Sequence, residues 1–255
     1  MPKIYKDEFI KLYDYKTKIG YDFFKEEEVI IREDKYKFLV CNIDLDIANC
    51  ALKLAKEKSK FTMTQNQASM PRDQITKVQK CMQGVLAEMF VHFLLIERYG
   101  LIILRYDLER ETFLYKTDEY DLKIIINETS YEVESRSSNI HYESIINFFN
   151  CDIIIGPYGN NIKMADELAD FHFRPIYTPN FVPFKEKDGK YLYNEDLFNG
   201  KIKLIITGVA TKEDFLNHGY LTTLGQKGTT YNVVKANIAG DIQLMDKKFG
   251  QIIKI

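Results

Sequence analysis

The sequence contains no tryptophan, and among its 255 residues only four are cysteine and four are histidine. The cysteines form no CxxC pair and the histidines lie far apart, so neither a zinc site nor a disulfide framework is expected. No apolar run approaches the roughly 18–20 residues that span a bilayer, and the charged N-terminus has no apolar signal segment. We therefore expect a cytoplasmic protein with reduced thiols and no membrane partner.

The chain also lacks a large excess of charge of either sign. Lys and Arg total 35 against 37 Asp and Glu, which gives a formal net charge of −2. This balance excludes a surface that is positive all over, although it allows one basic face. Hydrophobic residues make up 45% of the sequence, a share typical of a folded globular chain.

No repeat or low-complexity linker divides the chain, so its length predicts a single domain. We expect an α/β fold with its core at about 72–209 and peripheral additions at 1–71 and 210–255. Residues 1–40 have no clean period and are interpreted as partly helical. Residues 157–200 hold four of the six prolines and predict a loop-rich segment.

Two helices are predicted in the first hundred residues, at 44–58 and 72–99. In the second helix, apolar side chains recur every third or fourth position, and Gly100 marks its end. Gly84 lies in mid-helix, where glycine costs about 0.5–1 kcal/mol relative to alanine. We therefore expect a strand or a phosphate backbone to approach closely at this face, which Gly84 shares with Glu88.

Strands and one more helix are predicted after Gly100. The predicted strands are 101–106, 121–126, 131–135, 152–156, 202–209 and 231–235, and the predicted helix is 138–149. A four-residue connection, 127–130, joins the second and third strands into a hairpin. Helix, strand, hairpin, helix and strand in this order indicate an α/β core.

The predicted hairpin concentrates charge on one face. With the four-residue connection, Asp121 lies opposite Arg136 and Lys123 opposite Glu134, and Glu132 shares their face. Clustered carboxylates repel one another unless cations compensate them. Either the basic side chains do so on a solvated face, or a hard divalent cation such as Mg²⁺ or Mn²⁺ does.

This pattern resembles the PD-(D/E)XK nuclease superfamily, which includes many type II restriction endonucleases. The resemblance rests on a GxxAE-type helix at 84–88, the Asp-x10-Glu-x-Glu hairpin and the order of elements, and it covers about 72–156 and at most extends to 209. It implies a restriction-endonuclease-like core: a long helix, a mixed central sheet with the catalytic hairpin, a helix and a strand. It also implies hydrolysis of DNA phosphodiester bonds with Mg²⁺, or Mn²⁺ as a substitute, on double-stranded DNA by a homodimer.

The resemblance assigns roles residue by residue. Asp121 matches the metal-binding acid, Glu132 the first acid of the (D/E)XK triplet, and Glu88 the accessory acid of the helix. Asp121, Glu132 and the carbonyl of Val133 are expected to hold the metal. Glu134 occupies the position where most members have lysine, and it is expected to accept a proton from water or to bind a second ion.

Three alternatives to this assignment remain open. Lys123 could supply the missing ammonium group from the neighbouring strand. The triplet could instead be 134–136, with arginine in place of lysine. Asp118 or Glu119 could replace Asp121.

A basic segment precedes the hairpin, because residues 53–80 contain seven Lys and Arg against two acids. We expect it to flank the same cleft, with a polar stretch that reads base edges. The residues expected to contact DNA are Arg72, Lys77, Lys80, Lys123, Arg136, Gln65, Asn66 and Gln67. The alternatives to an active nuclease are a DNA-binding module of nuclease fold without catalysis, and a structural or interaction protein with a charged hairpin.

Overall fold

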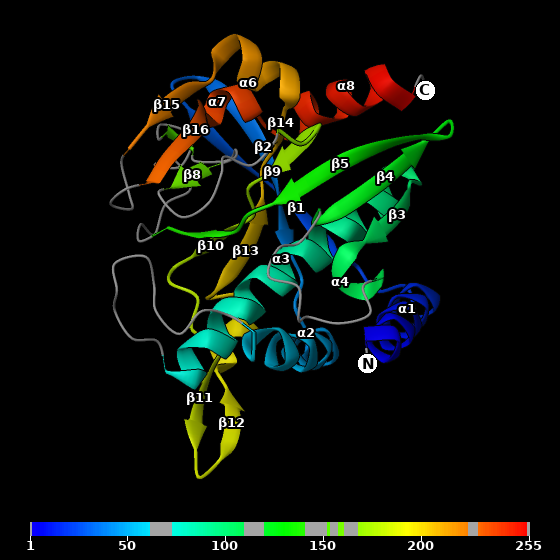
Figure 1. The fold of residues 1–255 in the computed structure, drawn as a ribbon, viewed down its shortest axis with the longest axis vertical. Helices are drawn as coiled ribbons and strands as arrows, with labels where there is room; N and C mark the ends of the chain where they lie inside the picture. The colour runs from blue at the N-terminus through cyan, green and yellow to red at the C-terminus, as the bar shows by residue number, and fades with distance from the viewer. Residues whose placement is uncertain are drawn as a thin grey trace.

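The computed structural model describes residues 2–61, 73–109, 120–140, 152–153, 158–160, 168–223 and 229–253. These residues form a mixed α/β fold (Figure 1). Among them, no helix is long and apolar enough to cross a membrane.

The helices lie at both ends and in the middle of the chain. They are α1 (Pro2–Lys18), α2 (Leu45–Ser59), α3 (Gln74–Tyr99), α4 (Tyr106–Glu109), α6 (Lys212–His218), α7 (Ala236–Ala239) and α8 (Ile242–Ile253), with a 3-10 turn η1 (Glu195–Leu197).

The strands are short, and the described ones form two five-stranded sheets, a four-stranded sheet and a two-stranded sheet. They are β1 (Phe24–Ile31), β2 (Asp34–Cys41), β3 (Ile102–Arg105), β4 (Leu122–Ile126), β5 (Thr129–Ser135), β6 (Ser138–Asn139), β7 (Asp152–Ile153), β8 (Tyr158–Asn160), β9 (Phe171–Phe173), β10 (Ile176–Thr178), β11 (Phe184–Lys187), β12 (Lys190–Tyr193), β13 (Lys203–Ile206), β14 (Val209–Thr211), β15 (Tyr220–Thr222) and β16 (Thr229–Lys235).

The long helix α3 is the central element of the core, and its predicted extent is confirmed. Asp73 caps its first turn by accepting a hydrogen bond from the Thr76 N–H at 2.6 Å, and Gly100 ends it with a φ of 63°. Its second half is apolar on nearly all sides and is buried, as the sequence predicts. The predicted helix 44–58 is likewise confirmed as α2.

The sheet that carries the hairpin has the order β14-β9-β5-β4-β3. Strands β3, β4 and β5 are antiparallel, whereas β9 runs parallel to β5. The predicted alternation is confirmed, because Leu122, Ile124 and Val133 are buried in the same core as α3. The order α3, β3, β4, β5 and then β9 therefore gives a mixed sheet with a long helix beside it (Figure 1).

The hairpin register differs from our prediction by two residues. Only Asn127 and Glu128 connect the strands, with φ values of 48° and 66°, so that Lys123 lies opposite Glu132 and Leu122 opposite Val133. Two consecutive residues of positive φ form the hairpin turn that matches the twist of paired strands. Since the shift is even, the same side chains still share a face, but their cross-strand partners change.

The N-terminal hairpin is not peripheral, contrary to expectation. Strand β2 pairs with β13 in a second sheet of order β1-β2-β13-β10-β6, and its last four residues, 38–41, are buried. The predicted loop region 157–200 also differs, because β8 to β12 lie within its described part. Aromatic and β-branched residues there pair over three or four residues, which is too short for a periodicity signal.

Three other predicted elements differ from the structure. The predicted strand 202–209 is interrupted at Gly208, where a Cβ would lie 2.4 Å from the Ala239 carbonyl, and β13 and β14 join different sheets. Of the predicted helix 138–149, the first two residues form β6, and 141–149 lie outside the described residues. Of the predicted strand 152–156, the part described is β7, which pairs with β16.

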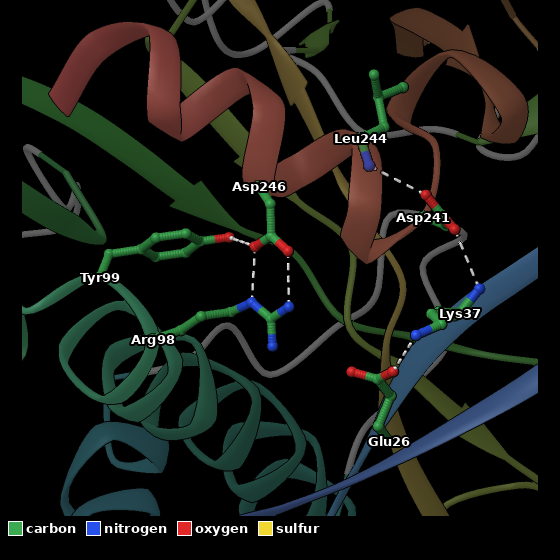
Figure 2. A network of polar contacts seen from close by, with 7 residues as sticks. All are labelled: Glu26, Lys37, Arg98, Tyr99, Asp241, Leu244 and Asp246. Atoms are coloured by element: carbon green, nitrogen blue, oxygen red, sulfur yellow. Dashed lines mark hydrogen bonds and ion pairs between the residues drawn. The ribbon is translucent and has the colours of Figure 1, made fainter. Parts of the chain in front are cut away.

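Polar contacts attach the C-terminal helix α8 to the core (Figure 2). Arg98 at the end of α3 donates two hydrogen bonds to Asp246, at 2.7 and 2.6 Å, and the Tyr99 hydroxyl donates a third at 2.8 Å. Asp241 accepts from the backbone N–H groups of Lys37 and Leu244, both at 3.1 Å. Helix α8 is thereby joined both to α3 and to β2.

Candidate active site

The candidate site lies where β5 and β9 end and β4 begins. Because β5 and β9 are parallel, their carboxyl ends meet at one edge, with Glu134 directly beside His172. Asp121 immediately precedes β4, and its Oδ2 accepts a hydrogen bond from the Ser135 N–H at 2.7 Å. This backbone contact places the Asp121 carboxylate beside the end of β5.

The Asp121 carboxyl is in a strongly unfavourable electrostatic position. Desolvation of the carboxyl raises its pKa well above the ordinary value of 3.8, and the negative charges of Glu88 and Glu134 raise it further. The Ser135 N–H and the Lys58 ammonium oppose this shift without cancelling it. The structure therefore brings three predicted site acids close enough to repel one another.

Glu88 reaches this region from α3 and is 6% exposed. The Arg105 Nη2 donates to its Oε2 at 3.0 Å, and the Lys58 Nζ lies 3.7 Å from its Oε1. Lys58 also forms a 2.7 Å ion pair with Asp107. Burial and then Asp107 raise the pKa of Glu88, and the two cations only partly oppose them.

Glu134 is held from both sides by basic groups. The Arg136 Nε donates to its Oε1, and the His172 Nδ1 lies 3.2 Å from its Oε2. The other ring nitrogen, Nε2, contacts the Ala169 carbonyl at 3.1 Å. Burial would raise the pKa of Glu134, but the hydrogen bonds and charges of His172 and Arg136 outweigh it and lower that pKa. Glu134 is therefore a charged carboxylate at neutral pH.

The structure does not bring Glu132 or Val133 to Asp121. The Glu132 side chain is 47% exposed, and its carboxylate lies 3.6 Å from the Lys123 Nζ. That ammonium also lies 4.1 Å from the centre of the Tyr120 ring. Lys123 therefore contacts Glu132 and Tyr120 and not the acid cluster, which is the group formed by Asp121, Glu88 and Glu134. Val133 is buried within the central strand β5. The observed register pairs Lys123 with Glu132, and the next residue pair on that face is Asp121 and Glu134.

Gly84 lacks the close neighbour that we expected. A Cβ at this position would meet only the Glu88 Oε1, at 3.9 Å, which is ordinary contact distance. No strand of the described chain therefore requires glycine here. As far as the described residues go, the space beside the Glu88 carboxylate is open at this position.

Three lysines of the predicted basic segment form ion pairs within the protein, namely Lys53, Lys58 and Lys60. Lys53 pairs with Glu8 at 3.1 Å, Lys60 pairs with Glu57 at 2.7 Å, and Lys56 lies over the Tyr191 ring at 4.3 Å. Lys58 contacts Glu88 and Asp107 at the candidate site.

The other predicted DNA contacts have separate locations. Lys77 is buried, and the exposed Lys80 donates to Gln83 at 3.2 Å. Arg136 lies at the acid cluster through its contact with Glu134. Four of the predicted DNA contacts lie outside the described residues, namely Arg72, Gln65, Asn66 and Gln67. The alternative acids Asp118 and Glu119 also lie outside them.

Sequence reasoning missed several residues of the site. His172 and Arg174 come from β9 and the residue after it, inside a segment interpreted as loop, and no motif indicated them. Arg105 is the last residue of β3 and Asp107 lies in α4, and neither carried a signal other than its charge. Lys58 was recognised only as one of many lysines.

The donor chemistry of the cluster fits a hard divalent cation, although the ligands are not assembled. In the described part of the chain, no three His, Cys, Asp or Glu side chains converge closely enough to hold a metal ion. Mg²⁺ is, however, usually bound by one or two carboxylates together with water and substrate phosphate. Asp121 and the charged Glu134 supply that number.

The chain matches no known protein-family model, no curated protein and no solved structure. The assignment of a function therefore depends on the geometry and electrostatics of this site.

Proposed function

We propose that this protein is a Mg²⁺-dependent endonuclease of the restriction type that hydrolyses phosphodiester bonds of double-stranded DNA. One observation carries the proposal: the repulsion that Glu88 and Glu134 exert on the Asp121 carboxyl, which hydrogen bonds to the backbone at the end of β5. A divalent cation relieves such repulsion more effectively than a single proton does. The order α3, β3, β4, β5, β9 supports a restriction-endonuclease-like core.

In this proposal Asp121 and Glu134 hold the metal, and the triplet is Glu134-Ser135-Arg136. This is the alternative in which arginine replaces the usual lysine, and the observed register favours it over the triplet 132–134. When bound, the ion supplies charge neutralisation at the scissile phosphate and acidifies the attacking water. Mn²⁺ has the same preference for oxygen ligands and would substitute for Mg²⁺.

The remaining side chains position the substrate and balance charge. Arg136 orients Glu134 through its Nε and presents a guanidinium beside the acids, where a phosphate would lie. Glu88 adds negative charge from α3 and is kept in place by Arg105 and Lys58. Since Glu134 carries a lowered pKa, its role is that of a charged ligand and not of a proton acceptor.

The proposed function also implies an oligomeric state. Cleavage of a palindromic site requires two active sites related by a twofold axis, so we propose a homodimer on DNA. We also propose that the protein acts in the cytoplasm.

Two matched variants test which acids belong to the site. Glu134→Gln removes the charge and keeps the size, and we expect cleavage of mixed DNA in Mg²⁺ to fall by roughly 10–100-fold, the range for weakening a metal site. Glu132→Gln makes the same change two residues away on the same face, and we expect its rate to stay within about twofold of the parent. Thermal melting of both variants controls for folding. If Glu132→Gln lost cleavage and Glu134→Gln kept it, the catalytic triplet would instead be 132–134.

A further inference from the structure

Two arginines lie side by side at the edge of the sheet where the acids gather. Residues 134 and 135 pair with 172 and 173 in the parallel ladder of β5 and β9, and one arginine follows each strand. The Arg136 N–H donates to the Phe173 carbonyl at 3.1 Å, which keeps the two strand ends together past the last pair. Arg136 and Arg174 therefore occupy matching positions on neighbouring strands.

Arg174 lacks an acidic partner in the described part of the chain. Its Nη2 donates to the neutral Ser138 hydroxyl, and none of the described carboxylates forms an ion pair with it. Its side chain is only partly exposed. Burial first, and then the positive charge of Arg136, lower its pKa from 12.5 to about 10, and the negative charge of Glu134 only partly opposes them. A desolvated guanidinium beside a second one is a costly arrangement that a bound anion relieves.

We propose that Arg136 and Arg174 form a clamp for one phosphate of the DNA backbone next to the carboxylate site. Two guanidinium groups on adjacent strand ends suit the several oxygens of one phosphate, because a guanidinium carries five N–H donors and can serve more than one acceptor. The Ser138 hydroxyl holds one edge of Arg174, and Glu134 holds the Nε edge of Arg136. The inference rests on the proposed function and assigns a role to Arg174 that no motif of the sequence indicates.

The salt dependence of duplex binding tests the clamp. Binding of a fluorescent DNA duplex is measured in EDTA, so that no cleavage occurs, at several salt concentrations. We expect Arg174→Gln to bind roughly 10–100-fold more weakly and to lose about one unit of the slope of log K against log salt, which corresponds to one phosphate contact. Arg174→Lys keeps the charge, so it should keep the slope and lose a smaller part of the affinity.

The control is Arg32→Gln, which removes an exposed arginine from the turn between β1 and β2. Equal affinity and equal slope for Arg174→Gln and Arg32→Gln would overturn the clamp. If Arg174→Gln does not fold, as judged by circular dichroism, the comparison uses Arg174→Lys, and an affinity equal to that of the parent would overturn the clamp.

Melting temperatures in inorganic phosphate distinguish a failure of the clamp from a failure of the proposed function. We expect phosphate to raise the melting temperature of the parent protein relative to chloride at equal ionic strength, and to have no such effect on Arg174→Gln. A parent protein that responds to phosphate through Arg174 but neither binds nor cleaves DNA would contradict the proposed function and leave an anion site. A parent that cleaves DNA, with Arg174→Gln indistinguishable from it in both assays, would contradict the clamp alone.

Discussion

Asp121 is the residue whose protonation should connect stability, pH and metal binding. Its pKa is raised in the folded state, which is the opposite of the usual shift for an aspartate in an ion pair. Between the unfolded value near 3.8 and the raised folded value, the folded chain binds more protons than the unfolded chain does. The contribution of Asp121 to stability is therefore present at low pH and is lost as the pH rises through this window.

We expect Asp121→Asn to be more stable than the parent near pH 7 in EDTA, and the difference to shrink to nothing below about pH 4. Asparagine retains an oxygen that can accept the Ser135 N–H, so the backbone contact is preserved. Melting temperatures across the pH range measure the effect, since about 1 kcal/mol corresponds to roughly 2–4 °C in a chain of this size.

Glu134→Gln is the control, because we expect it to change stability near pH 7 in the opposite direction to Asp121→Asn. The pKa of Glu134 is lowered, so its contribution is present above the unfolded value and is lost as the pH falls through the folded one. The variant should be less stable than the parent near pH 7. A melting curve for Asp121→Asn that follows the parent at every pH would contradict the electrostatic description of the cluster.

At the scale of elements, α3 shows how much of the site could be predicted. Its periodicity and its Gly100 end are local signals, and they predict the helix to within two residues. Gly84 and Glu88 were also identified from their spacing. The reason for Gly84 could not be predicted, because the contacts of a helix face depend on which distant segments pack against it.

Replacing Gly84 by alanine separates a packing role from a functional one. The added methyl group would meet only the Glu88 Oε1 at 3.9 Å, so we expect α3 to gain about 0.5–1 kcal/mol. If the open space beside Glu88 admits the DNA backbone, cleavage falls although stability rises. Gly250→Ala in α8 is the matched control, because nothing lies within 4 Å of its Cβ position. Equal cleavage by both variants would show that substrate does not use this space.

The hairpin turn explains why the sequence predicted the triplet 132–134, whereas the structure favours 134–136. Asn127 is a common turn residue, but a glutamate at a φ of 66° is unusual, so the two-residue turn carried no clear signal. The expected four-residue connection shifted the cross-strand partners by two, and Glu132 was linked to Asp121 only by the spacing of the family pattern. Strand existence and the apolar face followed from alternation alone, which an even shift leaves unchanged.

At the scale of the whole molecule, long-range pairing decided what local patterns could not. Strand β2 joins β13 across more than 160 residues of sequence, and β9 supplies His172 beside Glu134 from a segment of four prolines. Short strands of this kind acquire their structure from neighbours in the sheet and not from their own propensity. The site is consequently assembled from α2, α3, the β4–β5 hairpin and β9 together.

The central claim is that these assembled acids make the protein a metal-dependent nuclease. The most direct test is incubation of purified protein with mixed double-stranded DNA in Mg²⁺, beside the same reaction in EDTA and the same reaction with Asp121→Asn. We predict defined fragments in Mg²⁺ only, and none with EDTA or with the folded variant. Intact DNA in all three reactions, or fragments that persist in EDTA, would contradict the account.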